Sequence, residues 1–184
     1  MSSYSSDLLP VTFAAGATGP WKVERLIAVR GAPLIPAARL EIHPAHVVAP
    51  GAWSLRGVAG HARYVERHEK GPLDASSPSL GRPEATLAAL IPIRKSAGWW
   101  ALSQDERRAV FEARSHHVAD SMKYLPRIAR RLYHSRDLGE PFDFLTWFEL
   151  APEHEPAFDE LLALLRSREE WTFVEREVEL RLSR

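Results

Sequence analysis

Cysteine is absent from this 184-residue chain, and neither sign of charge is in excess. Without thiols the chain cannot form disulfides, use a thiolate nucleophile, or hold an iron–sulfur cluster or a cysteine-ligated zinc ion. Lys plus Arg and Asp plus Glu number 24 each. A net charge of zero gives no support to binding of nucleic acid or of a membrane surface, because both need a basic field.

Long apolar runs are also missing. No segment is apolar enough to span a bilayer. The N-terminal stretch MSSYSSDLLPVTFAAGATG has neither the basic start nor the apolar run of a signal peptide. The composition therefore predicts a soluble, cytoplasmic protein that forms one domain or two closely packed halves.

The first half of the sequence has weak periodicity. Residues 20–30 alternate like a strand, and residues 52–65 resemble a strand interrupted by Gly60. Residues 32–51 are rich in Ala and Pro and are predicted to be irregular. The Gly, Pro and Ser content of residues 68–83 predicts a loop. Residues 84–95 are strand-like, since Pro92 argues against a helix there.

The second half has clearer patterns. Ser103 and Glu106 form a capping box that predicts a helix from about Gln104, ending before Pro126. Residues 127–138 and 142–150 predict a strand pair across a Gly-Glu-Pro turn. A helix with Leu and Phe at helical spacing follows, and residues 171–182 alternate strictly as a final strand.

Together with the strand at 84–95, this order is β-α-β-β-α-β, the ferredoxin-like unit. The first half resembles the same unit with its helices largely lost. The expected fold is α+β, with an antiparallel sheet curling toward a barrel and helices outside. Residues 1–95 would form the abbreviated N-terminal half and residues 96–184 the C-terminal half of one compact unit.

Two adjacent histidines lie on the predicted helix. Neighbouring side chains on a helix point about 100° apart, so the two cannot have the same role. His116 is in register with Glu112 and Asp120 and belongs to the polar stripe, so we expect it to be solvated. His117 shares the inward stripe with Val110, Ala113, Ser121 and Tyr124. A lone inward histidine is more often a hydrogen-bonded core residue than a ligand, and both alternatives remain open at this point.

Arg130 lies beyond Pro126, on a strand face that it shares with Ile128, Leu132 and His134. Thirteen residues of straight helix span roughly 20 Å, so His117 and Arg130 could not meet over one ligand on an unbroken helix. Because the helix should end before Pro126, they can face one cavity from opposite sides. An arginine on an apolar face needs either an anion or a buried carboxylate partner.

Four segments resemble the chlorite dismutase family of haem b enzymes: ALIPIRKSAGWW, SHHVADSMKYLP, IARRLYHSRDLGEPFDFLTWFEL and EEWTFVEREVELRL. The resemblance covers about residues 10–184 and is to the short branch, which has an abbreviated N-terminal half. It implies ferredoxin-like repeats that form a dimeric α+β barrel. It also implies a homodimer with one haem b per subunit, bound in the C-terminal half.

The resemblance also implies roles for individual residues. His117 matches the proximal iron ligand, and Glu170 matches the carboxylate that hydrogen-bonds the other imidazole nitrogen. Arg130 matches the distal arginine. The remaining cofactor-binding positions are Leu132, Thr146 and Phe148 in the distal pocket, Tyr64 and Trp99 near the propionates, and Ile91 against the porphyrin. Trp100 is interpreted as a packing or subunit contact.

The implied reaction converts chlorite to chloride and molecular oxygen. In the family's chemistry, ferric haem takes an oxygen atom from chlorite, and the ferryl haem then recombines with hypochlorite. A distal wall with one cation and otherwise apolar side chains would attract this small anion. Two alternatives remain: peroxidase or porphyrin-modifying chemistry on the same fold, and haem carriage or sensing without catalysis. Arg130 weighs against the last, because a carrier does not need an anion-attracting cation.

Overall fold

A computed structural model describes residues 10–59 and 64–184, and within these residues eight antiparallel strands close into a barrel. The strands are β1 (Pro10–Gly16), β2 (Trp21–Arg30), β3 (Arg39–His43), β4 (Trp53–Ala59), β5 (Leu87–Lys95), β6 (Ile128–His134), β7 (Phe144–Leu150) and β8 (Val174–Ser183). Around the barrel they follow the order β1-β3-β2-β8-β5-β7-β6-β4.

The strand order contains the same pattern twice. In β4-β1-β3-β2 and again in β8-β5-β7-β6, the fourth strand lies beside the first, then the third and the second. Two ferredoxin-like units therefore form the barrel, and the first unit has only short connections between its strands. The expected α+β barrel with an abbreviated N-terminal half is confirmed. Where the chain divides into halves stays a prediction.

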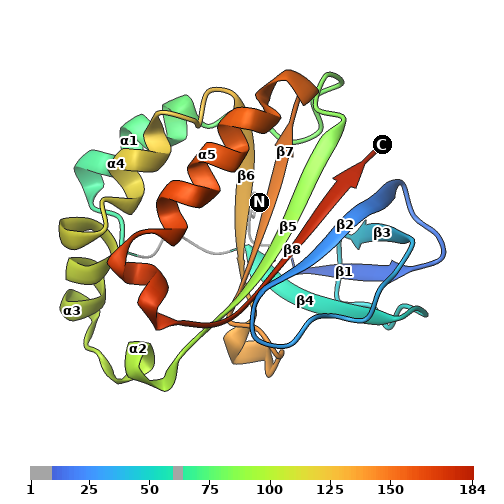
Figure 1. Cartoon of the computed structure of the whole chain (residues 1–184), viewed down its shortest axis with the longest axis horizontal. Helices are drawn as coiled ribbons and strands as arrows, with labels where there is room; N and C mark the ends of the chain where they lie inside the picture. Colours follow the sequence, from blue (N-terminus) through green and yellow to red (C-terminus); the bar gives the residue numbers. More distant parts are fainter. Residues whose placement is uncertain (1–9, 60–63) are drawn as a thin grey trace, which may run out of the picture.

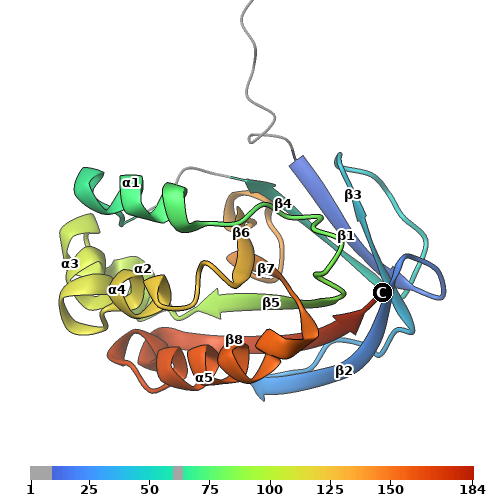
Figure 2. The same ribbon diagram turned by 90° about the horizontal axis from the view of Figure 1, so that it is seen from above.

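The helices lie against the second unit, away from β1–β3 (Figures 1 and 2). They are α1 (Arg67–Ser76), α2 (Ala97–Ala101), α3 (Gln104–Arg108), the π-helical turn η2 (Ala109–Arg114), α4 (His117–Met122) and α5 (Glu155–Arg166). Short 3-10 turns are η3 (Arg136–Leu138), η4 (Pro152–His154) and η5 (Glu169–Phe173). In the part of the chain described, no helix is both long and apolar enough to cross a membrane.

Alternation along the strands divides the apolar side chains between two cores. Side chains pointing into the barrel form the first core, which includes Phe13, Leu40, Leu55, Trp147 and Leu180. Side chains pointing outward from β5–β7 meet α5 in the second core, which includes Ile91, Phe148, Phe158, Leu161 and Leu162. Because the outer face of the sheet is apolar as well as the inner one, it must be shielded from water. The leucine stripe of α5 packs on this outer face and shields it.

Most predicted elements are confirmed. Strand β2 matches residues 20–30, β4 lies within 52–65, and β5–β8 and α5 match the second-half pattern. The capping box is formed, since the Ser103 amide donates to Glu106 Oε2 at 2.7 Å. The predicted interruption at Gly60 lies outside the described residues.

Two predictions were wrong, and one strand was not predicted. Residues 32–51 contain β3, which pairs with β1 over five positions and buries Leu40. Strand β1 was not predicted. Most of α1 lies within residues 68–83 despite Pro72, and a capping box between Glu66 and Glu69 starts this helix. Leu73 of α1 also packs with Val118 and Leu125, so tertiary contact overrides the loop-like composition.

Candidate active site

A cavity of about 660 Å³ lies between the outer face of β5–β7 and the helices that cover it. This volume is within the range of sites that hold small molecules and cofactors. The sequence-predicted residues all line it: Tyr64, Ile91, Trp99, His117, Arg130, Leu132, Thr146, Phe148 and Glu170. The structure thus brings together every position predicted for the site.

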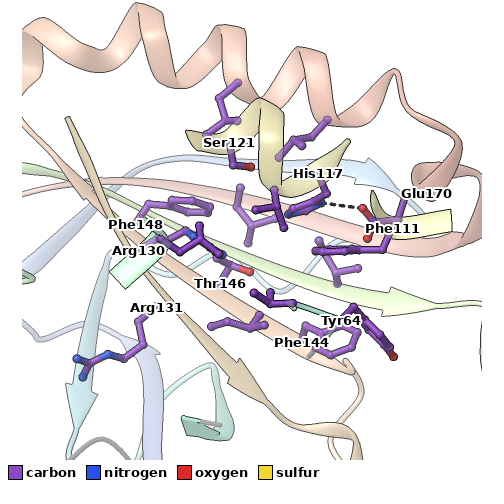
Figure 3. A pocket seen from close by; sticks show the side chains of 18 of the residues that line it. Tyr64, Phe111, His117, Ser121, Arg130, Arg131, Phe144, Thr146, Phe148 and Glu170 are labelled. Atoms are coloured by element: carbon purple, nitrogen blue, oxygen red, sulfur yellow. Dashed lines mark hydrogen bonds and ion pairs between the residues drawn. The ribbon is translucent and has the colours of Figure 1, made fainter. Parts of the chain in front are cut away.

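Strand register builds the sheet wall of the cavity. On one face, Phe148 of β7 lies between Ala89 and Arg130, and in the next row Thr146 lies between Ile91 and Leu132. Because side chains two residues apart share a face, these rows project toward the helices. Arg131, the neighbour of Arg130, also lines the cavity, but its side chain extends away from His117 (Figure 3).

The helical wall of the cavity is interrupted just before His117. The predicted helix runs through α3 into η2, where the turn widens to a π-helix, and it stops at Ser115. His116 follows with φ 52°, in the left-handed region that non-glycine residues rarely adopt, and α4 then begins at His117. His116 is exposed as expected, whereas His117 is half-buried and stacks on Phe111, with ring centroids 4.3 Å apart.

His117 is paired with a buried carboxylate. Its Nδ1 lies 2.7 Å from Glu170 Oε2, and Lys95 Nζ lies 2.7 Å from Glu170 Oε1 (Figure 3 draws the first contact). Burial alone would raise the pKa of Glu170, but the charges and hydrogen bonds of His117 and Lys95 outweigh it and lower this pKa from 4.5 to about 2. Glu170 is therefore an anion at neutral pH, and it directs Nδ1–H of His117 toward itself.

Lys95 was missed by the sequence analysis. It continues the outward face of β5 after Ile91 and Ile93, and only 5% of its surface is exposed. Its ammonium also lies 4.4 Å from the centroid of the Trp99 ring. A lysine at the end of an otherwise apolar strand face was the available signal for a buried acidic partner.

No carboxylate of the described residues lies beside Arg130. Within residues 10–59 and 64–184, no hydrogen bond or ion pair to its guanidinium is found, so a buried glutamate partner is not what balances it. Burial lowers the pKa of Arg130, yet a guanidinium keeps its proton in proteins. The cavity therefore contains a fixed positive charge with unused donors, which suits a small anion.

Aromatic donors lie at the edge of the same cavity. Trp99 is 1% exposed, and its buried Nε1–H has no acceptor among the described residues. Tyr64 packs edge-on against Trp99, with centroids 5.9 Å apart. By contrast, Trp100 donates from Nε1 to Asp143 at 3.2 Å and lies under the Arg136 guanidinium, which is a packing arrangement.

The sheet wall is less apolar than the sequence analysis assumed. His134 follows Leu132 on the outward face of β6, and it also lines the cavity. Its ring meets Phe144 edge-on at 5.6 Å between centroids. The shared face of β6 had been recognised from alternation, but His134 had not been assigned to the site.

The fold and the cavity define a class of protein: an α+β barrel whose covered sheet face carries a cofactor-sized cavity, a histidine–carboxylate pair and an arginine with no ion-pair partner in the described part of the chain. The chlorite dismutase family model matches residues 38–184. The chain belongs to the chlorite dismutase family, which is a family of haem enzymes.

Individual relatives agree with this assignment. The crystal structure of dimeric chlorite dismutases from Nitrobacter winogradskyi is 58% identical, covers 95% of this chain and 99% of that chain, and has a TM-score of 0.90. The chlorite dismutase of Ideonella dechloratans is 30% identical over 98 residues, which make up 52% of this chain and 33% of that protein. The alignment thus spans about a third of the curated relative.

More distant structures share the fold. A mutant chlorite dismutase from Candidatus Nitrospira defluvii, solved in complex with cyanide, is 22% identical. It covers 99% of this chain and 92% of its own, with a TM-score of 0.67. At this identity the likeness concerns the barrel alone.

Proposed function

We propose that this chain binds one haem b in the described cavity and decomposes chlorite to chloride and molecular oxygen, as a homodimer. The observation that carries the proposal is the unpaired Arg130 guanidinium in the cavity that also holds the His117–Glu170 pair. The dimeric relative from Nitrobacter winogradskyi, at 58% identity over nearly the whole chain, supports the homodimer.

The residues present fit a haem. Among the described residues, no group of three or more His, Asp or Glu side chains could hold a metal ion, so a metal at His117 would draw its other ligands from outside these residues, as a macrocycle provides them. The Nδ1 side of His117 is taken by Glu170, which leaves Nε2 as the metal-binding nitrogen. The orphaned Nε1–H of Trp99 is a buried donor that suits a propionate.

On the His117 side of the cavity, three residues orient the imidazole that would bind the iron. Glu170 accepts the Nδ1 proton of His117, which fixes the tautomer and makes Nε2 more electron-donating. Lys95 holds the second oxygen of Glu170 and keeps it ionised. The stack on Phe111 limits rotation of the imidazole ring. When bound, haem iron supplies the redox chemistry that removes an oxygen atom from chlorite.

On the sheet side of the cavity, Arg130 would bind the chlorite and hypochlorite anions. Its forked donors can orient chlorite on entry and retain hypochlorite until the oxygen–oxygen bond forms. Leu132 and Phe148 flank it on the wall and limit the water that competes for these donors. A fixed cation that has no counter-ion among the residues the structure describes is thus available to the substrate from the start.

An oxygen electrode tests the proposal directly. Chlorite added to the haem-loaded protein should release one molecule of oxygen per chlorite, with chloride as the other product. His117→Ala should abolish the release by losing the haem. Absence of oxygen release from haem-loaded wild-type protein would refute the chlorite assignment.

Peroxidase chemistry in the same cavity is a second candidate, and His134 favours it. Both ring nitrogens of His134 are buried, so the imidazole would have to turn toward the cavity to accept a proton from hydrogen peroxide. His134→Phe should then lower peroxide-dependent oxidation of a dye and leave oxygen release from chlorite unchanged. If peroxide turnover is negligible in the wild-type protein, or is unaffected by this substitution, the candidate is rejected.

A further inference from the structure

The His117–Glu170 contact joins two segments that lie far apart in sequence. His117 begins α4 and Glu170 lies in η5, 53 residues later. A hydrogen bond at 2.7 Å between such segments is maintained only if something fixes their relative position. The two segments are therefore the place to look for residues that act through Glu170 and His117.

Helix α4 cannot hold itself in place. It has six residues, and isolated helices of this length are unstable in water. Its first turn is capped from η2, because the Glu112 carboxylate accepts the amides of Val118 at 2.6 Å and Ala119 at 3.2 Å. This cap fixes the start of α4 and leaves its direction to be set by other contacts.

Two polar contacts beside the His117–Glu170 pair join the same segments. The fully buried Ser115 Oγ accepts the amide of Glu170 at 2.9 Å. One turn after His117, the 7%-exposed Asp120 accepts from Arg168, with Oδ2 lying 3.1 Å from Nε and 2.5 Å from Nη2. Arg168 directly precedes η5 and lies two residues before Glu170.

These contacts restrain rotation as well as distance. A single bond between α4 and η5 would let α4 swivel about that bond, which would carry the imidazole away from the carboxylate. The Asp120–Arg168 ion pair acts one turn further along α4 and removes this freedom. The planar guanidinium of Arg168 donates two hydrogen bonds to one carboxylate oxygen of Asp120, so this contact restricts the geometry more than a contact with a lysine ammonium would.

We infer that Asp120 and Arg168 are positioning residues, which hold Glu170 against Nδ1 of His117 and so set the donor strength of the imidazole. For the haem-bound protein this inference rests on the proposed function, since there His117 is the iron ligand. For the protein without haem it concerns only which nitrogen of His117 carries the proton.

The chain offers a matched control. Arg114 of η2 and Glu169 of η5 form an ion pair at 3.3 Å between neighbouring parts of the same segments. Their side chains are 53% and 45% exposed, whereas those of Arg168 and Asp120 are 32% and 10% exposed. Exposed pairs contribute little, so Arg114→Met should leave the His117–Glu170 contact unchanged.

The test uses Asp120→Asn, Arg168→Met, Arg168→Lys and Arg114→Met in the full-length protein. Without haem, nitrogen NMR of labelled histidine should find His117 in the Nδ1–H form in wild type, and mixed between both tautomers in Asp120→Asn and Arg168→Met. With haem, these two variants should lower the ferrous iron–histidine stretching frequency. They should also transfer haem to excess apomyoglobin roughly 3–10-fold faster, below the 10–100-fold typical of direct partners of a ligand.

Arg168→Lys should restore part of both signals, and it also serves if Arg168→Met does not fold. Tautomer populations and stretching frequencies in Asp120→Asn that equal those of Arg114→Met would overturn the inference. Failure of the wild-type protein to bind haem would instead overturn the proposed function, and the tautomer measurement would still decide the positioning role.

Discussion

Replacement of Arg130 by methionine should move stability and catalysis in opposite directions. Arg130 places a permanent charge in a largely apolar cavity with no carboxylate beside it among the described residues. Methionine has similar length, fills irregular space and carries no charge. The protein without haem should therefore gain stability, although it loses the group that we assign to substrate binding.

The size of the gain follows from the environment of the guanidinium. Replacing a buried ion pair with apolar residues of similar volume is often neutral or stabilises a protein by about 1–4 kcal/mol, and Arg130 lacks even the partner of such a pair among the described residues. Arg130 is only half-buried because it borders the cavity, so we expect roughly 1–3 kcal/mol here. For a chain of this length, that is a rise in melting temperature of about 2–12 °C in calorimetry of the apoprotein.

Catalysis should suffer at the same time. Removal of a preorganised donor to a developing anion slows well-studied enzymes by roughly 10²–10³. The loss here should be smaller, about 10–100-fold, because the iron provides the main anchor for the anion. Free hypochlorite should also escape, bleach the haem and chlorinate monochlorodimedone added as a trap.

Arg131 provides the matched control. It is the next residue on β6, and although it also lines the cavity, its side chain extends away from His117 (Figure 3). Arg131→Met should retain oxygen release from chlorite and should show no gain in melting temperature. An Arg130→Met protein that is less stable than wild type, and that keeps its rate and releases no trappable hypochlorite, would refute the reasoning. Arg130 would then be a structural residue.

Three further predictions concern the other side of the cavity. His117→Ala should lose most haem and His116→Ala should retain it, which the haem-to-protein ratio measures; equal losses would contradict the assignment. The stability supplied by Glu170 is complete above pH 4.5 and is lost as the pH falls toward about 2, so acid unfolding of Glu170→Gln apoprotein should lack this component. Trp99→Phe should release haem roughly tenfold faster, because a hydrogen bond to a charged group contributes about 1.5 kcal/mol. An unchanged release rate would exclude a Trp99–propionate contact.

Much of the cavity could be predicted because strand alternation is local. Given that β6 and β7 pair in register, the shared face of Arg130 and Leu132 and that of Thr146 and Phe148 follow from counting by two. Lys95 could not be assigned in the same way. A lysine at the end of β5 is ordinarily solvated, and its burial depends on Glu170, which lies 75 residues further along the chain.

Elements that depend on distant partners were also missed. Strands β1 and β3 are short. The ladder of paired residues between them stabilises both, and neither sequence alone reveals this pairing. Helix α1 contains Gly71 and Pro72, which argue for a loop. It forms because Leu73 closes the core with Val118 and Leu125, and none of these contacts can be read from periodicity.

The two adjacent histidines differ for a reason that a helical wheel does not contain. On an unbroken helix, His116 and His117 would differ only by rotation about one axis. In the structure the chain leaves η2, passes through the left-handed conformation at His116, and restarts as α4 at His117. This break exposes His116 and gives His117 a short helix of its own, whose start is capped by Glu112 and whose direction is set by the contact of Asp120 with Arg168 beside η5. The position of the imidazole therefore depends on side-chain contacts around α4, and we expect substitutions remote from the cavity to move His117 without contacting it.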